Sequence, residues 1–407
     1  MKVLYLAGDE LWFRRLPAAM ACREAGAEVV VMAPFQKYQR NAEAEGFKVI
    51  PWSISRRSLN PLREIRTFVQ VLDAYRQQRP DLVHHLALKG IIYGAAAARL
   101  CGGIPTVNSI AGLGRVFTVS TPGMRVLRRA VCSVLRGVFG GAHCRVTFEN
   151  EDDLNSLVEQ HIVAREVTKF IPGVGLDTER FLPVPETPGT PIVMLPSRML
   201  WEKGISVFVE AAARLRKDGL DARFVLVGAP DLENRGYIPE QQLKEWVTTG
   251  NVEWWGSNGD MPKTLSEAHV ICLPTYYREG LPRVLMEASA CARAIVTTDM
   301  PGCRHVVHDG ENGLLVPPKD VAALATAIKR LVEDPDLRQK MGAAGRVRAT
   351  TEFSEKTVQR QTFEVYRNLL GGNWPPSQYG ESERVSEFPQ KAAADVAVRC
   401  QESPLHS

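Results

Sequence analysis

Short apolar runs alternate with segments of helical spacing along most of the chain. In the first half these runs cover residues 2–7, 28–33, 47–52, 82–87, 105–110 and 145–150. Between them, segments such as FRRLPAAMACREAG and LREIRTFVQVLDAYRQQ repeat apolar residues with the period of a helix. Buried strands that are rich in β-branched residues and separated by helices predict a parallel sheet covered on both faces.

The alternation stops at FLPVPETPGTP (181–191), which contains four prolines and has no periodicity. We interpret this segment as an interdomain linker. A second series of predicted strands then covers 191–197, 222–228, 251–256, 269–274, 294–299 and 313–317. Predicted helices lie near 204–217, 239–247, 261–268, 282–291 and 319–333, and the segment Phe353–Leu370 is a last amphipathic helix.

The sequence therefore predicts an α/β protein of two doubly wound, Rossmann-like domains. We place the N-terminal domain at 1–180, the C-terminal domain at 181–352 and, at 353–372, a C-terminal helix that crosses back to the first domain. Ligands of such sheets bind at the carboxyl ends of the strands, so we expect a small-molecule site in a cleft between facing domains. The polar, broken sequence after the last helix predicts a disordered tail over 373–407.

The composition is that of a globular protein, with 45% hydrophobic and 24% charged residues. No apolar run has the length of about 18 to 20 residues that a transmembrane helix needs. The N-terminal segment lacks a small-residue cleavage site and is interpreted as a first strand. The eight cysteines are scattered without a CxxC pair, which fits a reducing cytoplasm.

The net charge of +4 is unevenly distributed. From Arg56 to Arg145 the chain has 14 Lys or Arg against three acids, a local excess of +11. Such a segment suits a nucleic acid, an anionic lipid or a phosphate ligand. It lacks the interleaved aromatic residues that would stack on bases, so we expect no nucleic acid as a partner.

The segment MRVLRRAVCSVLRGVF (124–139) concentrates this basic, apolar character. Read as a helix, its arginines flank one apolar side, formed by Val126, Leu127, Ala130, Val131, Val134, Leu135 and Val138. This is the composition of a helix that lies on a membrane surface, and equally that of a core helix with a basic outer face.

Two strand-to-helix turns of the second half have residues suited to a diphosphate. Arg198 and Lys203 follow the strand at 191–197, and the backbone amides of Gly280 and Leu281 precede a helix predicted to start at Pro282. Amides at a helix N-terminus, an arginine and a lysine all favour an anion. We assign two further strand-end glycines to this site, namely Gly8 and Gly228.

Two glutamates stand eight positions apart in the same segment. Glu279 precedes Gly280, and Glu287 lies inside the predicted helix. Carboxylates accept hydrogen bonds from hydroxyls, so Glu279 could hold a sugar beyond the diphosphate and Glu287 a ribose diol. The alternative interpretation is an exposed helix glutamate at Glu287 and a carboxylate favoured by the helix dipole at Glu279.

Several motifs in this order resemble the retaining nucleotide-sugar glycosyltransferases of family 4, which have the GT-B fold. They are R-M-L-W-E-K-G, R-E-G-L-P-x-V-L-M-E-A and D-M-P-G-C-R-H-V-V-x-D-G-x-N-G-L-L-V-P-P-K-D, preceded by the segments 148–153 and 171–177. The resemblance covers about residues 1–370. It implies that Glu279 contacts the donor sugar, Glu287 the ribose, and Arg198 and Lys203 the diphosphate, with catalysis by electrostatic stabilisation and no metal or other cofactor.

The first half is expected to hold the acceptor, with Asp9, Gly112 and Gly114 in its acceptor region. Many family members have a histidine near here, whereas the run 108–112 has none. The resemblance implies a front-face reaction in which the leaving phosphate takes the acceptor proton. A second difference is Cys291–Ala294, where relatives have Gly and Pro as turn residues; we expect altered local geometry and intact chemistry.

Within the family, three segments resemble the branch that extends lipid-linked oligosaccharides for bacterial surface polysaccharides such as O-antigen. They are the Gly-Leu-Gly run at 112–114, the Asn-Glu-Asp-Asp segment at 150–153 and Leu-Trp-Glu-Lys-Gly at 200–204. The resemblance then implies a UDP-sugar donor, a polyprenyl-diphosphate-linked acceptor, and peripheral attachment to the cytoplasmic face of the inner membrane through the basic first half. The alternatives are a GDP-mannose-type glycosyltransferase with a soluble or lipid acceptor, and a nucleotide-sugar epimerase.

Two other classes fit the sequence less well. No predicted strand is followed by GxGxxG, which disfavours a dinucleotide-dependent oxidoreductase. Asp334-Pro335-Asp336 has the DxD pattern of metal-dependent glycosyltransferases, but it stands between two helical segments. We interpret the proline as a break between those helices and expect no metal there.

Overall fold

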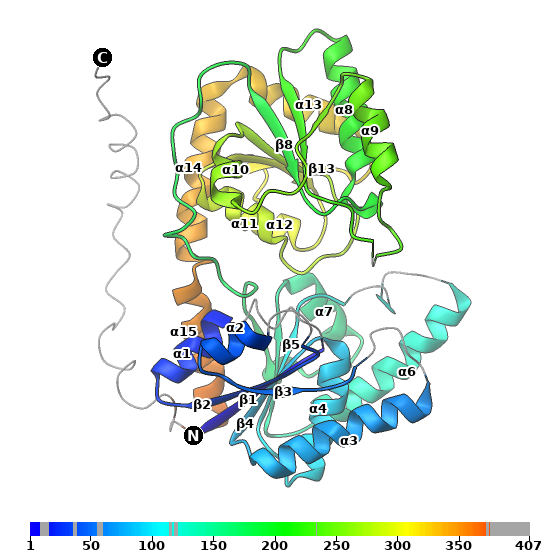
Figure 1. The fold of residues 1–407 in the computed structure, drawn as a ribbon, viewed down its shortest axis with the longest axis vertical. Helices are drawn as coiled ribbons and strands as arrows, with labels where there is room; N and C mark the ends of the chain where they lie inside the picture. The colour runs from blue at the N-terminus through cyan, green and yellow to red at the C-terminus, as the bar shows by residue number, and fades with distance from the viewer. Residues whose placement is uncertain are drawn as a thin grey trace. The chain divides into compact units, whose positions relative to one another are not determined.

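The computed structural model of the protein describes residues 1–8, 16–35, 39–54, 60–113, 116–117, 121–232, 234–371 and 374, without the side chains of Leu16 and Asn41. The chain divides into two compact units. The first unit comprises Met1–Gly175 and the C-terminal segment from Glu355, and the second comprises Leu176–Ser354. Each unit is an α/β fold built around its own sheet (Figure 1).

The described part of the first unit forms a seven-stranded parallel sheet of order β3-β2-β1-β4-β5-β6-β7. Its strands are β1 (Lys2–Ala7), β2 (Glu28–Ala33), β3 (Lys48–Pro51), β4 (Leu82–Leu86), β5 (Thr106–Ile110), β6 (Cys144–Phe148) and β7 (Thr168–Phe170). Its helices are α1 (Leu16–Glu24), α2 (Gln39–Ala44), α3 (Pro61–Gln78), α4 (Leu88–Leu100), α6 (Pro122–Phe139), α7 (Glu151–Glu159), the 3-10 turn η2 (Arg165–Val167) and α15 (Glu355–Leu369).

The described part of the second unit forms a six-stranded parallel sheet of order β10-β9-β8-β11-β12-β13. The strands are β8 (Ile192–Pro196), β9 (Arg223–Val227), β10 (Glu253–Trp254), β11 (Val270–Leu273), β12 (Ala294–Thr298) and β13 (Gly313–Val316). The helices are the 3-10 turn η3 (Trp201–Lys203), α8 (Ile205–Lys217), α9 (Glu240–Thr248), α10 (Met261–Ser266), α11 (Arg283–Ala290), α12 (Cys303–Val306), α13 (Val321–Glu333) and α14 (Pro335–Thr351).

The central strands are buried on both faces, as the apolar runs predict. In β1, Leu4 and Tyr5 are both almost fully buried but belong to separate hydrophobic clusters. Because successive side chains of a strand point to opposite faces, these clusters are the two layers between the sheet and its helices. The predicted parallel sheets with helices on both faces are confirmed.

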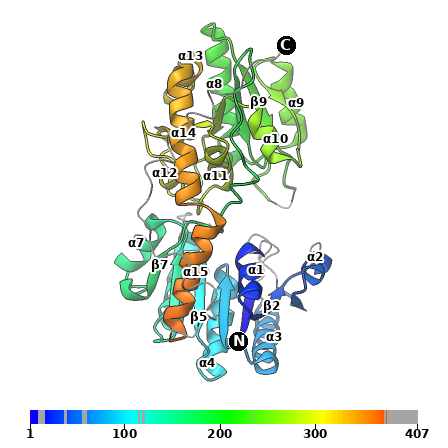
Figure 2. The ribbon, with the colours of Figure 1, turned by 90° about the vertical axis from the view of Figure 1, so that its left-hand side faces the viewer.

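The last helix completes the first unit, in agreement with the predicted helix that crosses back to the first domain. Figure 2 shows α15 beside α1. Tyr366 on α15 forms hydrogen bonds through its hydroxyl with His84 Nδ1 at 2.7 Å and with the hydroxyl of Tyr5 at 3.0 Å. Since all three side chains are buried, these bonds tie α15 to β1 and β4.

The proline-rich segment 181–191 is not a linker between the units. Phe181 is buried in the second unit's core, and Glu186 accepts two hydrogen bonds from the buried guanidinium of Arg338 at 2.7 and 2.6 Å. The prolines make this segment irregular, but its side chains belong to the second unit. The chain passes between units upstream of it, at Gly175 and Leu176.

The predicted tail lies outside the described residues except for Trp374, and there the prediction is wrong. Trp374 is buried and packs edge-on against Phe363 and Tyr366 of α15, and its carbonyl oxygen accepts a hydrogen bond from Arg367. An aromatic ring that covers the end of α15 removes apolar surface from water, which explains its burial.

Helix α6 buries a narrower side than predicted. Cys132, Leu135 and Val138 are buried, whereas Val126 and Val134 are exposed. The buried residues all lie in the C-terminal half of the helix, whereas Val126 in the N-terminal half is exposed. Among the described helices of the protein, none is both long and apolar enough to cross a bilayer.

Candidate functional site

Close backbone contacts draw together the loops at the carboxyl edge of the second sheet. Gly228, just after β9, has a φ of 138°, and a Cβ there would lie 1.8 Å from the carbonyl oxygen of Ser197, just after β8. Gly204 has a φ of 76°, and a Cβ there would lie 2.0 Å from the carbonyl oxygen of Pro274, just after β11. Only glycine fits both positions, so these residues allow the loops after β8, β9 and β11 to meet.

The 3-10 turn η3, which carries Lys203, is held against the loop after β11. The carbonyl oxygen of Glu202 accepts hydrogen bonds from Thr275 Oγ1 at 3.0 Å and from the N–H of Tyr276 at 3.1 Å. The carbonyl oxygen of the buried Thr275 in turn accepts from Thr298 Oγ1 at 2.5 Å. Three strand ends therefore fix where Lys203 lies.

Lys203 and Glu279, both singled out from the sequence, are in direct contact. Lys203 Nζ donates to Glu279 Oε2 at 2.6 Å, and their side chains are only 12% and 17% exposed. Water and salt screen an ion pair with so little solvent contact only weakly, so the electrostatic attraction between the ammonium group and the carboxylate stays strong. The pair joins a cation suited to a phosphate to a carboxylate suited to hydroxyls.

Arg198 occupies the same edge of the sheet but contacts a different carboxylate. Its Nη1 donates to Asp231 Oδ2 at 2.6 Å, and the arginine side chain is 61% exposed. Asp231 is not among the site residues predicted from the sequence. It could have been recognised as a charged residue shortly after a predicted strand, because Asp231 follows β9 as Arg198 follows β8.

Glu287 is buried in α11, which excludes the interpretation as an exposed helix glutamate. Its Oε1 accepts from Arg283 Nε at 2.8 Å, one helical turn earlier. Helix α11 begins at Arg283, with Pro282 as its N-cap residue, one position later than predicted. Leu281 is buried in the hydrophobic core, while Gly280 is half-buried.

The loop that carries Glu279 rests on the turn before α12. Gly302 has a φ of 73°, and a Cβ there would lie 1.7 Å from the carbonyl oxygen of Gly280. The next residue, Cys303, is fully buried, and this burial, together with the nearby charge of Glu279, raises the pKa of its thiol to about 12. A neutral thiol and a glycine thus support the loop without adding charge next to the ion pair.

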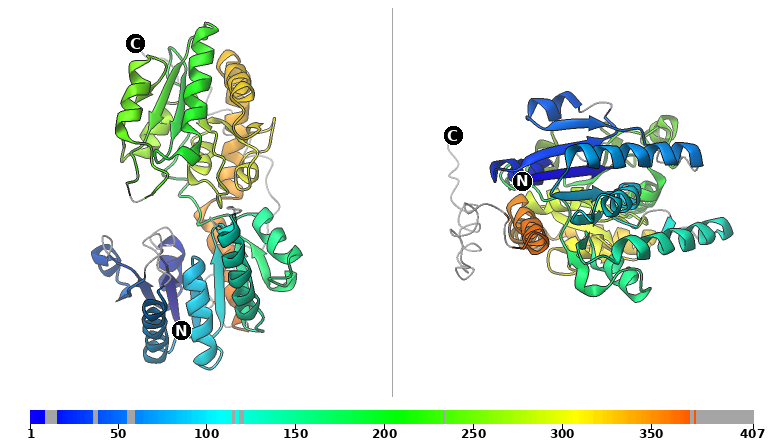
Figure 3. Two further views of the ribbon diagram at one scale, coloured as in Figure 1. Left: turned by 90° about the vertical axis from the view of Figure 1, so that its right-hand side faces the viewer. Right: turned by 90° about the horizontal axis from the view of Figure 1, so that it is seen from below.

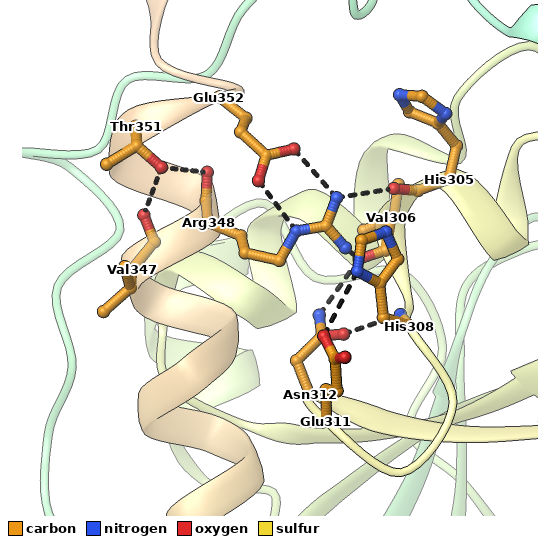
Figure 4. Close-up of polar contacts among 9 residues, drawn as sticks. All are labelled: His305, Val306, His308, Glu311, Asn312, Val347, Arg348, Thr351 and Glu352. Carbon is orange, nitrogen blue, oxygen red and sulfur yellow. Dashed lines mark hydrogen bonds and ion pairs between the residues drawn. The ribbon is translucent and has the colours of Figure 1, made fainter.

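Helix α12 is held in turn from α14, as Figure 4 shows. Arg348 donates hydrogen bonds to the carbonyl oxygens of His305 and Val306 at 3.0 and 3.1 Å, and Asn312 Nδ2 donates to the oxygen of Val306 at 3.0 Å. Glu352 binds the same guanidinium through both carboxylate oxygens, at 2.9 and 2.8 Å. These bonds satisfy the free carbonyl groups at the end of α12.

In the first unit, the predicted residues that the structure describes lie at one edge of the sheet. Gly8 directly follows β1, and its N–H donates to the carbonyl oxygen of Leu86 at 3.2 Å. Gly112 follows β5 and has a φ of 146°. Asp9 and Gly114 lie outside the described residues. Gly8 belongs to a different unit from the other residues assigned to the nucleotide sugar.

The DxD segment has a structural explanation. Asp334 is the N-cap of α14, with Oδ1 accepting from the N–H of Leu337 at 2.9 Å, and Pro335 is the first residue of that helix. The predicted helix break is confirmed. Among the described residues, no group of His, Cys, Asp and Glu side chains is arranged to hold a metal ion. Independence from metals stays a prediction.

Two doubly wound parallel sheets in series define the GT-B class of fold. The crystal structure of HepE from Anabaena in complex with UDP has a TM-score of 0.74 with this protein, covers 90% of this chain and 100% of its own, and is 19% identical. Residues 2–138 match the family described as Glycosyl transferase 4-like, and residues 178–348 match Glycosyl transferases group 1. The chain belongs to the glycosyltransferases with these two domains, and it is an enzyme of that class.

Two curated relatives match along almost their whole length. The N,N'-diacetylbacillosaminyl-diphospho-undecaprenol alpha-1,3-N-acetylgalactosaminyltransferase of Campylobacter jejuni is 26% identical over 89% of this chain and 97% of its own. The putative glycosyltransferase EpsD of Bacillus subtilis is 27% identical over 90% of this chain and 96% of its own. The predicted fold and family are confirmed, while the roles of individual residues stay predictions.

Proposed function

We propose that this protein is a retaining glycosyltransferase that moves a hexose or N-acetylhexosamine from a UDP-sugar to a polyprenyl-diphosphate-linked saccharide in bacterial surface-glycan synthesis. The observation that carries the proposal is the contact between Lys203 and Glu279 at the carboxyl edge of the second sheet. An ammonium group next to a carboxylate suits a ligand in which a phosphate adjoins a sugar. The ammonium group can bind the phosphate, and the carboxylate can accept hydrogen bonds from the sugar hydroxyls.

The donor half of the reaction follows from the charges at this edge. Lys203 and Arg198 would bind the diphosphate, and the hydroxyl groups of the donor sugar would donate hydrogen bonds to Glu279. As the bond between the sugar and the phosphate breaks, negative charge accumulates on the leaving diphosphate, and fixed cations there lower the barrier. Glu287, oriented by Arg283, would accept from the ribose diol.

The acceptor half rests on the first unit and on the relatives. The name of the Campylobacter jejuni relative includes diphospho-undecaprenol, which supports a polyprenyl-diphosphate acceptor here. Gly112, which was assigned to the acceptor region, follows β5 at the carboxyl edge of the first sheet, where ligands of parallel sheets bind. The incoming hydroxyl would attack from the face that the diphosphate leaves, and its proton would pass to the leaving phosphate.

A lipid-linked acceptor requires the enzyme to reach a membrane, and two helices of the first unit have suitable surfaces. Helix α3 exposes Leu62, Ile65 and Val69, and α6 exposes Val126 and Val134. Helix α4 packs against both and lies between them (Figure 3). We call these five exposed residues the apolar surface of the first unit.

The same two helices also carry arginines close in sequence to the apolar surface, namely Arg63 and Arg66 on α3 and Arg125, Arg128 and Arg129 on α6. Exposed apolar side chains among arginines are typical of proteins that bind anionic bilayers peripherally. We therefore place the enzyme on the cytoplasmic face of the inner membrane, with the apolar surface against the lipid.

One experiment tests donor, acceptor and stereochemistry together. Thermal unfolding with a panel of nucleotide sugars identifies the donor, since a ligand raises stability according to its affinity. Transfer from that donor to an undecaprenyl-diphosphate-linked saccharide is then measured, and NMR gives the anomer of the product. We expect a UDP-sugar and retention. Stabilisation by GDP-mannose alone, an inverted product, or equal transfer to the free saccharide would each overturn the corresponding part of the proposal.

A further inference from the structure

A buried carboxylate connects α7 to the loop after β5. Asp153, in the first turn of α7, is 1% exposed. Its Oδ2 accepts hydrogen bonds from the N–H of Leu113 at 3.1 Å and from Asn150 Nδ2 at 3.1 Å. Leu113 lies 40 residues earlier in the chain, directly after Gly112. The contact therefore joins the loop after β5 to the start of the helix that follows β6, and these two strands are neighbours in the sheet.

The cap of α7 does not by itself explain this arrangement. Asn150 is the N-cap residue: its Oδ1 accepts from the N–H of Asp153 at 2.8 Å, and its Nδ2 donates to the Asp153 carboxylate. Such a cap works at the protein surface with an exposed carboxylate or amide. Here the carboxylate is buried, although removing a charge from water costs solvation free energy. It also accepts a hydrogen bond from a distant loop, which a helix cap does not require.

The same contact fixes the shape of the segment 111–113. Leu113 is buried in the hydrophobic cluster that also contains Ile110 and Leu154, and its N–H is bound by Asp153. Gly112, just before it, adopts a φ of 146°. Because β5 ends at Ile110 and Leu113 is anchored by Asp153, the two residues between them have a short, restricted backbone path. This path lies at the edge where a ligand of the first sheet would bind.

We propose that Asp153 is a positioning residue for the acceptor: by holding the N–H of Leu113 it fixes the backbone at 111–113 in the shape that receives the acceptor saccharide. The inference rests on the proposed function, since it concerns the acceptor of that transfer. Asp153 does not touch the reacting atoms. Its contribution is to keep the loop ordered before the acceptor arrives, which reduces the ordering cost of binding.

The test compares Asp153→Ala and Asp153→Asn with the control Glu151→Gln, which removes an exposed carboxylate from the same helical turn. The acceptor KM, the kcat, the thermal stabilisation by donor, and the slow hydrolysis of donor without acceptor are measured. We expect Asp153→Ala to raise the acceptor KM on the order of tenfold. Donor stabilisation and donor hydrolysis should stay unchanged, because Lys203, Glu279 and Arg198 lie in the second unit.

The Asp153→Asn variant separates positioning from folding, because its amide oxygen can still accept from Leu113. It should raise the acceptor KM less than Asp153→Ala does, and Glu151→Gln should match the wild type. If Asp153→Ala fails to fold, a raised acceptor KM in Asp153→Asn supports the inference and an unchanged one overturns it. Equal losses of transfer and of donor hydrolysis would also overturn it. A wild-type protein without transfer to any lipid-linked saccharide would instead overturn the proposed function itself.

Discussion

Lys203 Nζ lies 2.6 Å from Glu279 Oε2, and this contact joins the loop after β8 to the loop after β11. The two residues stand 76 positions apart in the chain. If they bind the diphosphate and the donor sugar, both are needed in the transition state. The first two predictions follow from the charges at this edge of the sheet.

Lys203→Ala is expected to lower kcat by roughly 100- to 1,000-fold, since loss of one group that stabilises developing charge typically has an effect of this size. Glu279→Ala should lower kcat similarly by loss of sugar orientation. Steady-state transfer assays measure both. Lys244→Ala, which removes an exposed lysine of the same unit, is the control and should leave kcat unchanged. Near-normal transfer by either site variant would show that the site is assigned wrongly.

Asp231→Asn is expected to lower the donor KM a few-fold, because Asp231 holds the guanidinium of Arg198 that a diphosphate would otherwise bind. Arg198→Ala should have the opposite effect and raise the donor KM. Titration of the donor with the acceptor saturating measures both changes. The matched control is Glu333→Gln, which neutralises a carboxylate in an exposed ion pair of α13. A donor KM that rises in Asp231→Asn would mean that Asp231 assists binding.

Gly302→Ala is expected to reduce transfer strongly, because a Cβ at this position would lie 1.7 Å from the carbonyl oxygen of Gly280 and displace the loop of Glu279. Gly310→Ala is the control. Gly310 has a nearly equal φ, 77° against 73°, but a Cβ there meets nothing within 4 Å. The control thus contains the backbone strain of a positive φ without the collision. Equal activity of the two variants in the transfer assay would contradict the role of Gly302.

These residues also show which features the sequence could predict. Strands such as β1 and β2 were predicted to the residue because burial on both faces produces an uninterrupted apolar run. Strand β7 is not predicted from the sequence, because three residues are too few to show a periodic pattern and none of them is fully buried. The prolines of 181–191 indicate a linker, and nothing in the local sequence shows that Phe181 is buried. That burial depends on tertiary packing against residues far along the chain.

The sequence predicts which residues belong to the site, but it does not predict which of them contact each other. Motif spacing identified Lys203, Glu279 and Arg198, and the structure brings the first two together. It places Arg198 on Asp231, 33 residues further along the chain, a contact that depends on the order of strands in the sheet. The close approach of Gly302 to Gly280 likewise becomes visible only when the turns are positioned in space.

The fourth prediction concerns stability against pH and rests on His85 in β4. This histidine is fully buried, with Nδ1 in a hydrogen bond to Asn108 Oδ1 at 2.7 Å and Nε2 in one to the hydroxyl of Tyr75 at 2.9 Å. Burial lowers the pKa of His85 from 6.5 to about 4, which outweighs the opposite effect of the hydrogen bond with Asn108. Between these values the unfolded chain binds a proton and the folded chain does not, so the free energy of unfolding falls as pH decreases from about 6.5 to about 4.

His85→Gln removes this titration, so the free energy of unfolding of the variant should fall less steeply over the same window. Urea unfolding at several pH values measures both slopes. The comparison uses the slopes alone, because the substitution also changes the absolute stability. Parallel slopes would indicate that His85 takes up its proton in the folded state as readily as in the unfolded chain.

The last prediction concerns the apolar surface on α3 and α6. Ile65→Glu and Val126→Glu each place a carboxylate among side chains that would enter the lipid interface, so each should weaken binding to vesicles with anionic lipid at any ionic strength. Arg125→Gln with Arg129→Gln should weaken binding mainly at low salt, because screening already suppresses those charges at high salt. Sedimentation with vesicles at increasing salt distinguishes the two effects. The control is Lys217→Gln with Lys244→Gln, which makes the same change of charge on the second unit. If the control pair weakens binding as much as the arginine pair does, net charge and not this surface brings the enzyme to the membrane, and if the two glutamate variants bind like the wild type, α3 and α6 do not contact the lipid.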